Sequence, residues 1–208
     1  MDTSTLQTDH LSKKLSQPLP GKLAHQNMWV PGRGDYPTVP TDAKKAAVLI
    51  FIYPRLDKTF ISFIKRVQHP GDRHGGQISF PGGKVEHTDD FPIQTALREA
   101  NEEIGVPLTV EVLGKLSPLY IPVSGFIVHP VIAFHHESIP FHMHPDEVDE
   151  ILEIEVDHLF HADSKSRTDV YTPSGVIIQD VPCYIVNGTM IWGATAMILA
   201  ELEYLWKS

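Results

Sequence analysis

The arrangement of three glutamates near the middle of the chain constrains its fold more than any other feature. Glu99, Glu102 and Glu103 stand at positions i, i+3 and i+4, a spacing that places them on one side of a helix. With Ile93 at zero on a helical wheel, these glutamates fall between about 180° and 280°, and the apolar residues lie within about 60° of zero. Those apolar residues are Ile93, Ala96, Leu97, Ala100 and Ile104. The sequence therefore predicts an amphipathic helix with a core face and a separate carboxylate face.

Such a carboxylate face is either a solvated helix surface or a ligand set for a cation. Like charges at this spacing repel, and hard oxygen ligands suit a divalent ion such as Mg²⁺. The neighbouring segments favour the cation. Residues 79–84 are typical of a strand end followed by a glycine-rich loop, and Asp90 is predicted to cap the helix with Pro92 in its first turn. Gly105 stands where the helix is expected to stop, so strand, loop and carboxylate helix converge at one place.

The segment from Arg98 to Val106 resembles the second half of the Nudix hydrolase signature. That signature is G-x5-E-x7-R-E-U-x-E-E-x-G-U, where U is an apolar residue, and the segment agrees with it at every fixed position. The first half departs from the pattern. The signature expects Glu where this chain has Asp90, and Gly where it has Lys84 after Gly83. This offset indicates one extra residue in the loop.

A second motif is similar to one branch of that family, the coenzyme A diphosphatase-like branch. The segment 77–83, preceded by 74–76, resembles the extra motif that this branch carries upstream of the signature, together with a longer loop. Further similar segments are 122–126, 145–148 and 191–196. The resemblance implies an α/β fold, a Nudix-type α/β/α sandwich with a mixed β-sheet. It covers residues 40–208 as the Nudix hydrolase domain, with 1–39 as a partly flexible N-terminal extension.

The resemblance also implies roles for the residues of the signature. It implies an Mg²⁺- or Mn²⁺-dependent enzyme that hydrolyses a nucleoside diphosphate linkage. Glu99 and Glu103 are expected to be the principal metal ligands, and Glu102 a ligand or the base. The carbonyl of Gly83 is expected to complete the ligand set, and Arg98 to orient the glutamates by hydrogen bonding. Divalent ions neutralise phosphate oxygens and acidify water, and a nearby carboxylate accepts the proton.

The resemblance favours coenzyme A or an acyl-CoA as substrate, cleaved to 3′,5′-ADP and (acyl-)4′-phosphopantetheine. The expected substrate-binding residues are Arg66, Arg73, His74, Gln77 and Lys84. Glu147 is a candidate extra carboxylate, with a loop or capping acid as the alternative. Two other functions remain open. One is a general hydrolase of ADP-ribose or dinucleotides, and the other is a non-catalytic ligand-binding Nudix domain, against which the intact signature glutamates argue.

Composition limits the classes of partner. A chain of 208 residues suits one globular domain, and a net charge of −9 argues against nonspecific nucleic-acid binding. Local cations must therefore attract an anionic small-molecule substrate. The single Cys183 excludes an intrachain disulfide and lies in an apolar run, which indicates a buried structural thiol. With no apolar run near the ~20 residues of a membrane helix and no secretory leader, we expect a cytoplasmic protein. A homodimer remains open.

Strand-like segments surround the glutamate helix. Ala47–Ile52 and Thr59–Lys65 are predicted to form a hairpin with its turn near 54–57. Further predicted strands are Thr109–Leu116, Phe126–Phe134, Glu153–Val156 and Val176–Ile185, with a brief helix at 157–160 and a C-terminal helix at 195–206. The histidines at 135, 136, 142 and 144 lack zinc-site spacing and are predicted to lie in solvated loops.

Overall fold

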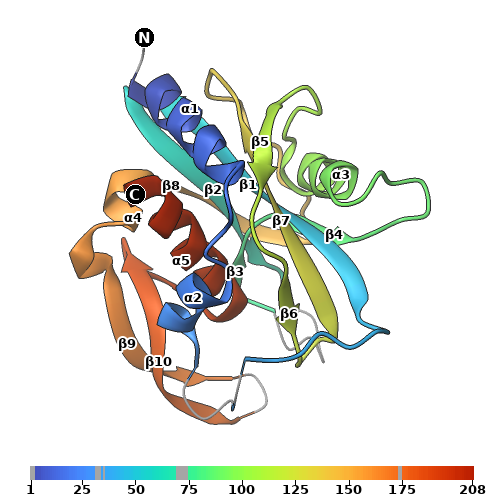
Figure 1. The fold of residues 1–208 in the computed structure, drawn as a ribbon, viewed down its shortest axis with the longest axis vertical. Coiled ribbons are helices and arrows are strands. Elements are labelled where there is room, and N and C mark those ends of the chain that lie inside the picture. The colour runs from blue at the N-terminus through green and yellow to red at the C-terminus, as the bar shows by residue number, and fades with distance from the viewer. Residues whose placement is uncertain (1–2, 31–33, 35, 69–74, 173–174) are drawn as a thin grey trace.

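One mixed β-sheet lies between two layers of helices in the computed structural model, which describes residues 3–30, 34, 36–68, 75–172 and 175–208 (Figure 1). The large sheet contains β1 (Lys44–Arg55), β2 (Lys58–Arg66), β3 (Ile78–Ser79), β4 (Gly82–Lys84), β5 (Glu111–Lys115), β6 (Leu119–Ile121), β7 (Phe126–Phe134) and β8 (Val148–Glu155). A second sheet contains β9 (Lys165–Tyr171), β10 (Ile177–Val186) and β11 (Thr189–Trp192). The helices are α1 (Thr3–Leu15), α2 (Lys22–His25), α3 (Ile93–Ile104), α4 (Val156–Leu159) and α5 (Gly193–Lys207), with 3₁₀ turns at Gln26–Met28 and Ala162–Ser164. This arrangement confirms the predicted fold class.

The long strand β1 is the centre of the large sheet. It pairs in parallel with β7 as far as Ile52 and antiparallel with β2 and β4. The β1–β2 hairpin closes in a two-residue turn, in which Leu56 and Asp57 have φ angles of 50° and 60°. Positive φ at both central residues matches the twist of the flanking strands. The predicted hairpin is confirmed, but its turn is shorter than expected because Arg55 still pairs with Lys58.

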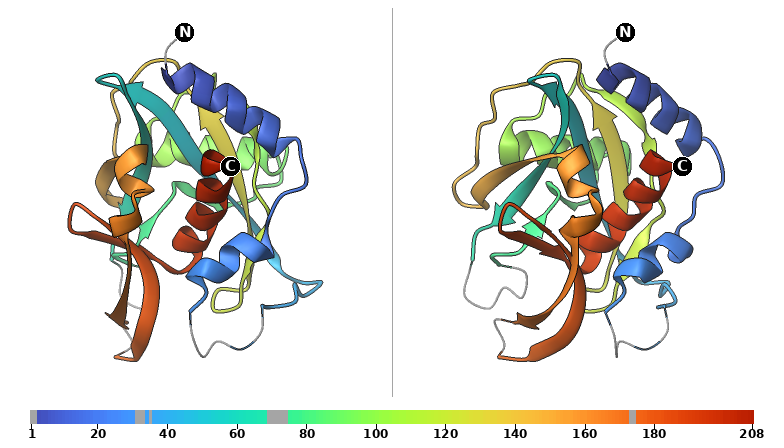
Figure 2. Two further views of the ribbon diagram at one scale, coloured as in Figure 1. Left: turned by 60° about the vertical axis from the view of Figure 1, so that its left-hand side comes forward. Right: turned by 90° about the vertical axis from the view of Figure 1, so that its left-hand side faces the viewer.

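Both faces of β1 are buried because helices cover both sides of the sheet. Leu49 and Phe51 belong to a core cluster that includes the apolar face of α3. Ile50 and Ile52 point the other way, into a cluster that includes α5. Figures 1 and 2 show α3 on one side of the large sheet and α1 and α5 on the other. A strand buried on both faces is a continuous apolar run, which explains the unbroken pattern of this segment.

The N-terminal segment is helical where the sequence analysis predicted no helix. In α1, Leu11 is fully buried and packs in the cluster that contains α5. The helix carries few apolar residues, and its stability comes from this packing more than from its own pattern, which is why the sequence did not reveal it. The division into an extension at 1–39 and a domain at 40–208 stays a prediction.

Two strand assignments need correction. β8 begins at Val148, well before the predicted strand at Glu153, because it pairs along most of β2. Two adjacent acidic residues, Asp149 and Glu150, concealed its early part. β6, β9 and β11 were not predicted at all, whereas β7 has the predicted bounds. Cys183 is buried in β10 as predicted, and burial raises the pKa of its thiol. Among the described helices, none is long and apolar enough to cross a membrane.

Candidate active site

A glycine loop brings β4 into close contact with β1 and α3. Gly82 pairs with Val48 of β1 and has a φ angle of 152°, and a Cβ at this position would overlap the Val48 backbone. A Cβ at Gly83 would overlap the carboxylate of Glu99. Only glycine has no side chain to clash in either place. The two glycines therefore allow the loop backbone to lie directly against the carboxylate helix.

The carboxylates of α3 lie in an environment that disfavours their charge. Glu103 is only 2% exposed, and its Oε2 accepts a hydrogen bond of 2.7 Å from the Gly82 N–H. Burial raises the pKa of Glu103 to about 8, and repulsion from Glu99 and Glu147 adds to this effect. Burial also raises the pKa of Glu99, although the neighbouring Arg98 opposes the shift. These carboxylates are incompletely compensated by the protein itself.

Arg98 is the hydrogen-bonding hub of the loop and the helix. Its guanidinium donates to both oxygens of Asp89 at 3.2 and 3.1 Å and to the Lys84 carbonyl at 3.0 Å. It also donates to Glu99 and Glu102, each at 3.0 Å. The hydrogen bonds from Arg98 lower the pKa of Asp89 to about 2. Arg98 thus connects the loop backbone with the glutamates. Its guanidinium binds these protein groups and does not line the cavity described below.

The start of α3 differs from the prediction. Pro92 is the residue that precedes the helix, and no side chain caps the helix there. Asp90 contributes its backbone: its carbonyl accepts from the Gln94 N–H, and its own N–H donates to the Gln94 side chain at 2.7 Å. The prediction of an Asp90 side-chain cap is therefore wrong, because the helix begins two residues later than that cap requires. The end is as predicted, with Gly105 in the left-handed conformation.

A cavity of about 460 Å³ lies where the loop, α3 and the start of β8 meet. The residues lining it are Arg66, Gly82, Gly83, Lys84, Val85, Glu86, Glu99, Glu103 and Glu147. Glu147 is held there by a hydrogen bond from the Val67 N–H to its carbonyl. Arg66 Nη1 lies 3.9 Å from Glu103 Oε1. Four carboxylate residues and two cationic residues, from four segments of the chain, therefore line one cavity.

The cavity gathers some of the residues singled out in the sequence and not others. Glu102 is more than half exposed and lies beside Arg98, away from the lining residues. The Gln77 carbonyl accepts from the Arg66 N–H at 3.2 Å, so this residue supports the cavity wall through its backbone. Arg73 and His74 lie outside the described residues. Arg98 binds the glutamates without lining the cavity itself. The other candidates line it: Arg66, Gly83, Lys84, Glu99, Glu103 and Glu147.

Two acidic residues of the loop had no role in the sequence analysis. Asp89 binds Arg98 through both oxygens and accepts from the Thr95 hydroxyl at 2.9 Å. Glu86 lines the cavity and lies 3.8 Å from Arg98. The acidic stretch 86–90 was the available signal. Counting back from Arg98 puts Asp90 at the position of the signature glutamate, but the acid that binds Arg98 is Asp89.

The chemistry of this cavity fits a divalent cation. Its donors are carboxylate oxygens and loop carbonyls, the hard ligands that Mg²⁺ and Mn²⁺ prefer. The raised pKa values of Glu99 and Glu103 indicate carboxylates whose charge is only partly compensated, since burial outweighs the effect of Arg98 and Arg66. In the described parts of the chain, no group of three His, Cys, Asp or Glu side chains is arranged so that it could hold a metal ion. Closing such a ligand set requires the side chains to turn from their present partners, Arg98 and Gly82.

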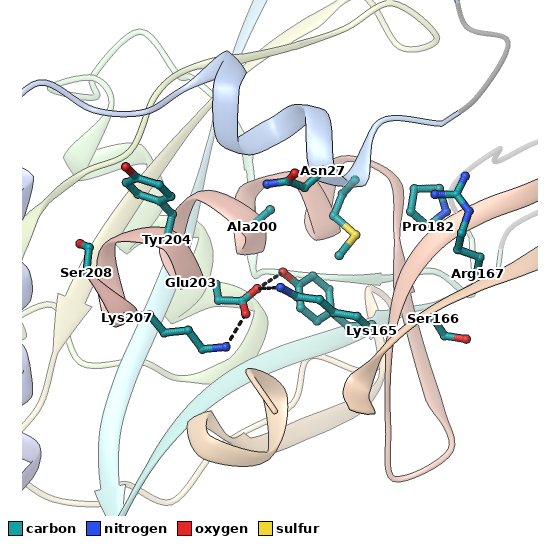
Figure 3. Close-up of a pocket in the computed structure, with 12 residues that line it drawn as sticks. Asn27, Lys165, Ser166, Arg167, Pro182, Ala200, Glu203, Tyr204, Lys207 and Ser208 are labelled. Carbon is teal, nitrogen blue, oxygen red and sulfur yellow. Dashed lines mark hydrogen bonds and ion pairs between the residues drawn. The ribbon is translucent and has the colours of Figure 1, made fainter. Parts of the chain in front are cut away.

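A second, larger cavity of about 720 Å³ lies on the α5 side of the molecule (Figure 3). Its central carboxylate, Glu203, accepts from Lys165 at 2.8 Å, Lys207 at 2.6 Å and the Tyr184 hydroxyl at 2.7 Å. Burial alone would raise the pKa of Glu203, but these three donors lower it. The larger of these two cavities thus holds a compensated carboxylate, whereas the smaller one holds the incompletely compensated cluster.

A family model of the NUDIX domain matches residues 43–172, which include the glycine loop, α3 and Glu147. The chain belongs to the Nudix family. It is a Nudix hydrolase, and this family acts on nucleoside diphosphate-linked substrates. The part of the sequence-based assignment that named the family is therefore confirmed, and the branch and its substrate belong to the proposal below.

Curated relatives include Nudix hydrolases named NudL from Yersinia pestis (strain Pestoides F) and Yersinia pseudotuberculosis (serotype O:1b), which are described as uncharacterized. Each is 36% identical over 160 residues, which cover 76% of this chain and 78% of the relative. Among solved structures, a MutT/nudix family protein from Enterococcus faecalis aligns with a TM-score of 0.48 at 15% identity, covering 97% of this chain and 73% of that chain. The Nudix hydrolase RenU from M. smegmatis aligns with a TM-score of 0.47 at 22% identity, covering 56% of this chain and 73% of that one.

Proposed function

We propose that this Nudix hydrolase cleaves the diphosphate of coenzyme A or an acyl-CoA in the cytoplasm, releasing 3′,5′-ADP and (acyl-)4′-phosphopantetheine. The observation that carries the hydrolytic part is the shared cavity, in which Glu99, Glu103 and Glu147 meet beside a glycine loop. A diphosphate carries two negative charges, so a site for it needs cations to offset its own carboxylates. The proposed cofactor is Mg²⁺ or Mn²⁺.

The glutamates and the glycine loop have proposed roles. Glu99 and Glu103 hold the metal, with the Gly83 carbonyl beside them, and Glu147 is an additional carboxylate. When bound, the cation neutralises charge on the diphosphate oxygens and makes a nearby water more acidic. Glu102 is a ligand or the base that accepts the proton of that water. The exposed position of Glu102 makes the base role depend on a turn of its side chain away from Arg98.

Arg98 is proposed as a positioning residue. Its hydrogen bonds to Glu99 and Glu102 hold both carboxylates, and its bond to the Lys84 carbonyl holds the loop. Charge-assisted bonds of this kind are stronger and more directional than neutral ones. Because Arg98 is committed to protein groups, the substrate phosphates fall to other cations, with Arg66 and Lys84 on the cavity wall.

The choice of coenzyme A is supported by the sequence segment 77–83 and by the cations beside the cavity. Coenzyme A offers a diphosphate, a 3′-phosphate and a pantetheine arm, whereas ADP-ribose lacks the 3′-phosphate. Arg66 and Lys84 both line the cavity, and Arg73, His74 and Gln77 lie between them in the sequence. Neither nucleic acid nor a membrane is a proposed partner, and a homodimer is compatible with the proposal.

A substrate panel tests this function. The purified protein is incubated with Mg²⁺ and coenzyme A, 3′-dephospho-coenzyme A, ADP-ribose or NADH, and the products are separated by chromatography. We expect the highest kcat/KM for coenzyme A, with 3′,5′-ADP as a product, and complete loss of activity in EDTA that Mg²⁺ or Mn²⁺ restores. A clear preference for ADP-ribose would replace the proposal with a general nucleoside diphosphate hydrolase, and activity under stringent chelation would refute the metal mechanism.

A further inference from the structure

Two lysines from different strands converge on one aromatic ring beside the catalytic cavity. Phe126 at the start of β7 is half-buried, and the ammonium nitrogens of Lys44 and Lys84 lie 5.8 and 5.9 Å from the centre of its ring. Lys44 is the register partner of Phe126, and Lys84 is the partner of Ala46, two residues further along β1. Residues two apart on a strand share a face, so all three side chains project from the same face of the sheet.

The charges of this group are not offset by the protein. Among the described residues, neither Lys44 nor Lys84 forms an ion pair, although many other cations of this acidic chain do, such as Lys58 with Glu155 and Lys65 with Asp149. An aromatic face attracts a cation but carries no net charge. Two ammonium groups therefore lie near one ring without a carboxylate partner among the described residues, and an anion bound beside that ring would be attracted by both.

The position of Lys84 links this group to the catalytic cavity. Its backbone follows Gly83, whose missing side chain leaves room for the Glu99 carboxylate, and the residue lines the cavity. Its carbonyl accepts from Arg98 at 3.0 Å, so the strand that carries the lysine is fixed to the carboxylate helix. Its side chain projects on the face opposite α3, around the edge strand β4. A substrate whose diphosphate is bound at the carboxylates can therefore contact these lysines only through a second anionic group. That group must be several bonds away from the diphosphate.

We propose that Lys44, Lys84 and Phe126 form a subsite for a second phosphate group of the substrate, one attached to the nucleoside and separate from the diphosphate that is cleaved. The inference rests on the proposed function and narrows it to nucleoside diphosphates that carry an extra phosphomonoester. The two ammonium groups hold the phosphate oxygens, and the Phe126 ring keeps the lysine side chains in place. The subsite is a determinant of specificity and takes no part in bond cleavage.

Product binding tests the subsite without relying on turnover. Isothermal titration calorimetry measures the affinities of 3′,5′-ADP and 5′-AMP, which differ only in the 3′-phosphate, for the full-length protein. The variants are Lys44→Gln, Lys84→Gln and their combination. Lys45→Gln is the matched control, because Lys45 is the next residue of β1, is also exposed and lies 5.6 Å from the Phe91 ring, but points to the opposite face.

We expect wild-type protein to bind 3′,5′-ADP at least about tenfold more tightly than 5′-AMP, as for one or two charge-assisted contacts. Each single variant should reduce that ratio several-fold, the double variant should bring it close to one, and Lys45→Gln should leave it unchanged. A wild-type ratio near one, or equal losses in Lys45→Gln, would overturn the subsite. If the ratio behaves as expected but coenzyme A is not hydrolysed, the subsite stands and the proposed substrate fails. If coenzyme A is hydrolysed and the ratio ignores both lysines, only the subsite fails.

Discussion

One carboxylate of α3 and one of α5 are similarly buried but have opposite pKa shifts. Glu103 of α3 and Glu201 of α5 are 2% and 0% exposed. The pKa of Glu103 is raised, whereas that of Glu201 is lowered. Burial acts in the same direction on both, so the difference comes from their partners. The comparison separates a carboxylate kept for chemistry from one used for structure.

Glu201 is compensated from four directions. Its oxygens accept from the Gly21 N–H at 3.0 Å, the Ser117 hydroxyl at 2.7 Å and the Ser117 N–H at 3.1 Å. His25 Nε2 lies 3.0 Å from the remaining side of the carboxylate. These partners come from the N-terminal segment and from the loop before β6, so Glu201 connects α5 to both. Burial raises the pKa of Glu201, but these donors together lower it.

Glu103 has far less compensation. Among the described residues, it receives one backbone hydrogen bond, from Gly82, and the cation that pairs with it, Arg66, is 3.9 Å away. Arg98, which lies beside Glu99 and Glu102 on the same helix, forms two of its hydrogen bonds with Asp89. A buried carboxylate without a partner costs free energy, and a cation ligand removes that cost. A buried carboxylate whose charge is incompletely compensated, and which lines a cavity, therefore indicates a binding site for a cation. Glu99, beside Glu103, has the same property.

The largest expected effect is on turnover at the α3 side. Glu103→Gln removes one negative charge from the cavity and preserves the shape of the side chain. We expect kcat to fall by at least about 100-fold. The melting temperature without metal should stay the same or rise, because the buried charge is gone. Steady-state kinetics and thermal unfolding measure the two effects.

Metal-linked stability sharpens that result. Mg²⁺ should raise the melting temperature of the wild type, because a ligand of the folded state stabilises it, and this increase should disappear in Glu103→Gln. A variant with near wild-type turnover would mean that the glutamates form a solvated helix face. In that case the contrast between α3 and α5 would have no functional meaning.

The second effect is the reverse, a loss of stability at the α5 side without a loss of chemistry. Glu201→Gln places an amide among donors that require an acceptor, so at least one donor is left without a partner. The free energy of unfolding should fall by about 2–4 kcal/mol, measured by chemical denaturation. The kcat of the folded fraction should change less than twofold. A large fall in kcat with unchanged stability would remove the distinction between the two helices.

The sequence showed α3 and its ligands better than it showed α5 and its partners. The helix, its glutamates and its Gly105 end were predicted because their pattern is local in the chain. The partners of Glu201 lie at residues 21, 25 and 117, far from it in sequence. No local pattern brings such residues together, so the network appears only after folding. Glu147 lies between these cases, because its acidic run suggested a ligand but only the β2–β8 pairing places it in the cavity.

The features that the sequence did not reveal also depend on contacts between residues far apart in the chain or on loop length. The loop 84–92 departs from the family pattern by one residue. Counting along the chain puts Asp90 at the position of the signature glutamate, whereas Asp89 is the acid that binds Arg98. Helix α1 was missed because Leu11 gains its burial from distant elements. The subsite lysines were also partly missed: Lys84 was a candidate by proximity, but Lys44 becomes its neighbour only through the pairing of β1 with β4 and β7.

A third effect is on the pH dependence of stability. The pKa of Glu201 is lower in the folded protein than its ordinary value of 4.5. Between these two values the unfolded chain binds more protons, so stability rises with pH in that window. The stabilisation by Glu201 is thus fully present above pH 4.5 and is lost as the pH falls through the folded value. The difference in unfolding free energy between wild type and Glu201→Gln should be constant from pH 5 to 7 and shrink below pH 4.5. Other acidic groups are common to both proteins and cancel in the difference, so a gap that stays constant down to pH 3 would contradict the assignment.

The smallest expected effect tests how Arg98 is divided between the loop and the helix. Asp89→Asn keeps one acceptor oxygen but removes the charge that binds Arg98 through two bonds. Without that charge, Arg98 binds the loop less tightly and pairs more strongly with Glu99. The charge of Glu99 is then better compensated, as that of Glu201 in α5 already is. We expect kcat/KM to fall about tenfold, equivalent to about 1.4 kcal/mol, and the Mg²⁺ concentration for half-maximal activity to rise.

Asp90→Asn is the matched control for this prediction. Asp90 is the next residue, carries the same charge and occupies the position at which the family signature has Glu. Its hydrogen bonds to Gln94 use the backbone, which the substitution leaves intact. We expect kcat/KM within about twofold of wild type, since surface substitutions of this kind have small effects. If Asp90→Asn loses more activity than Asp89→Asn, the family pattern is a better guide than the Arg98 contacts. Asp89 would then not be the residue that, by binding Arg98, leaves the charge of the α3 carboxylates incompletely compensated.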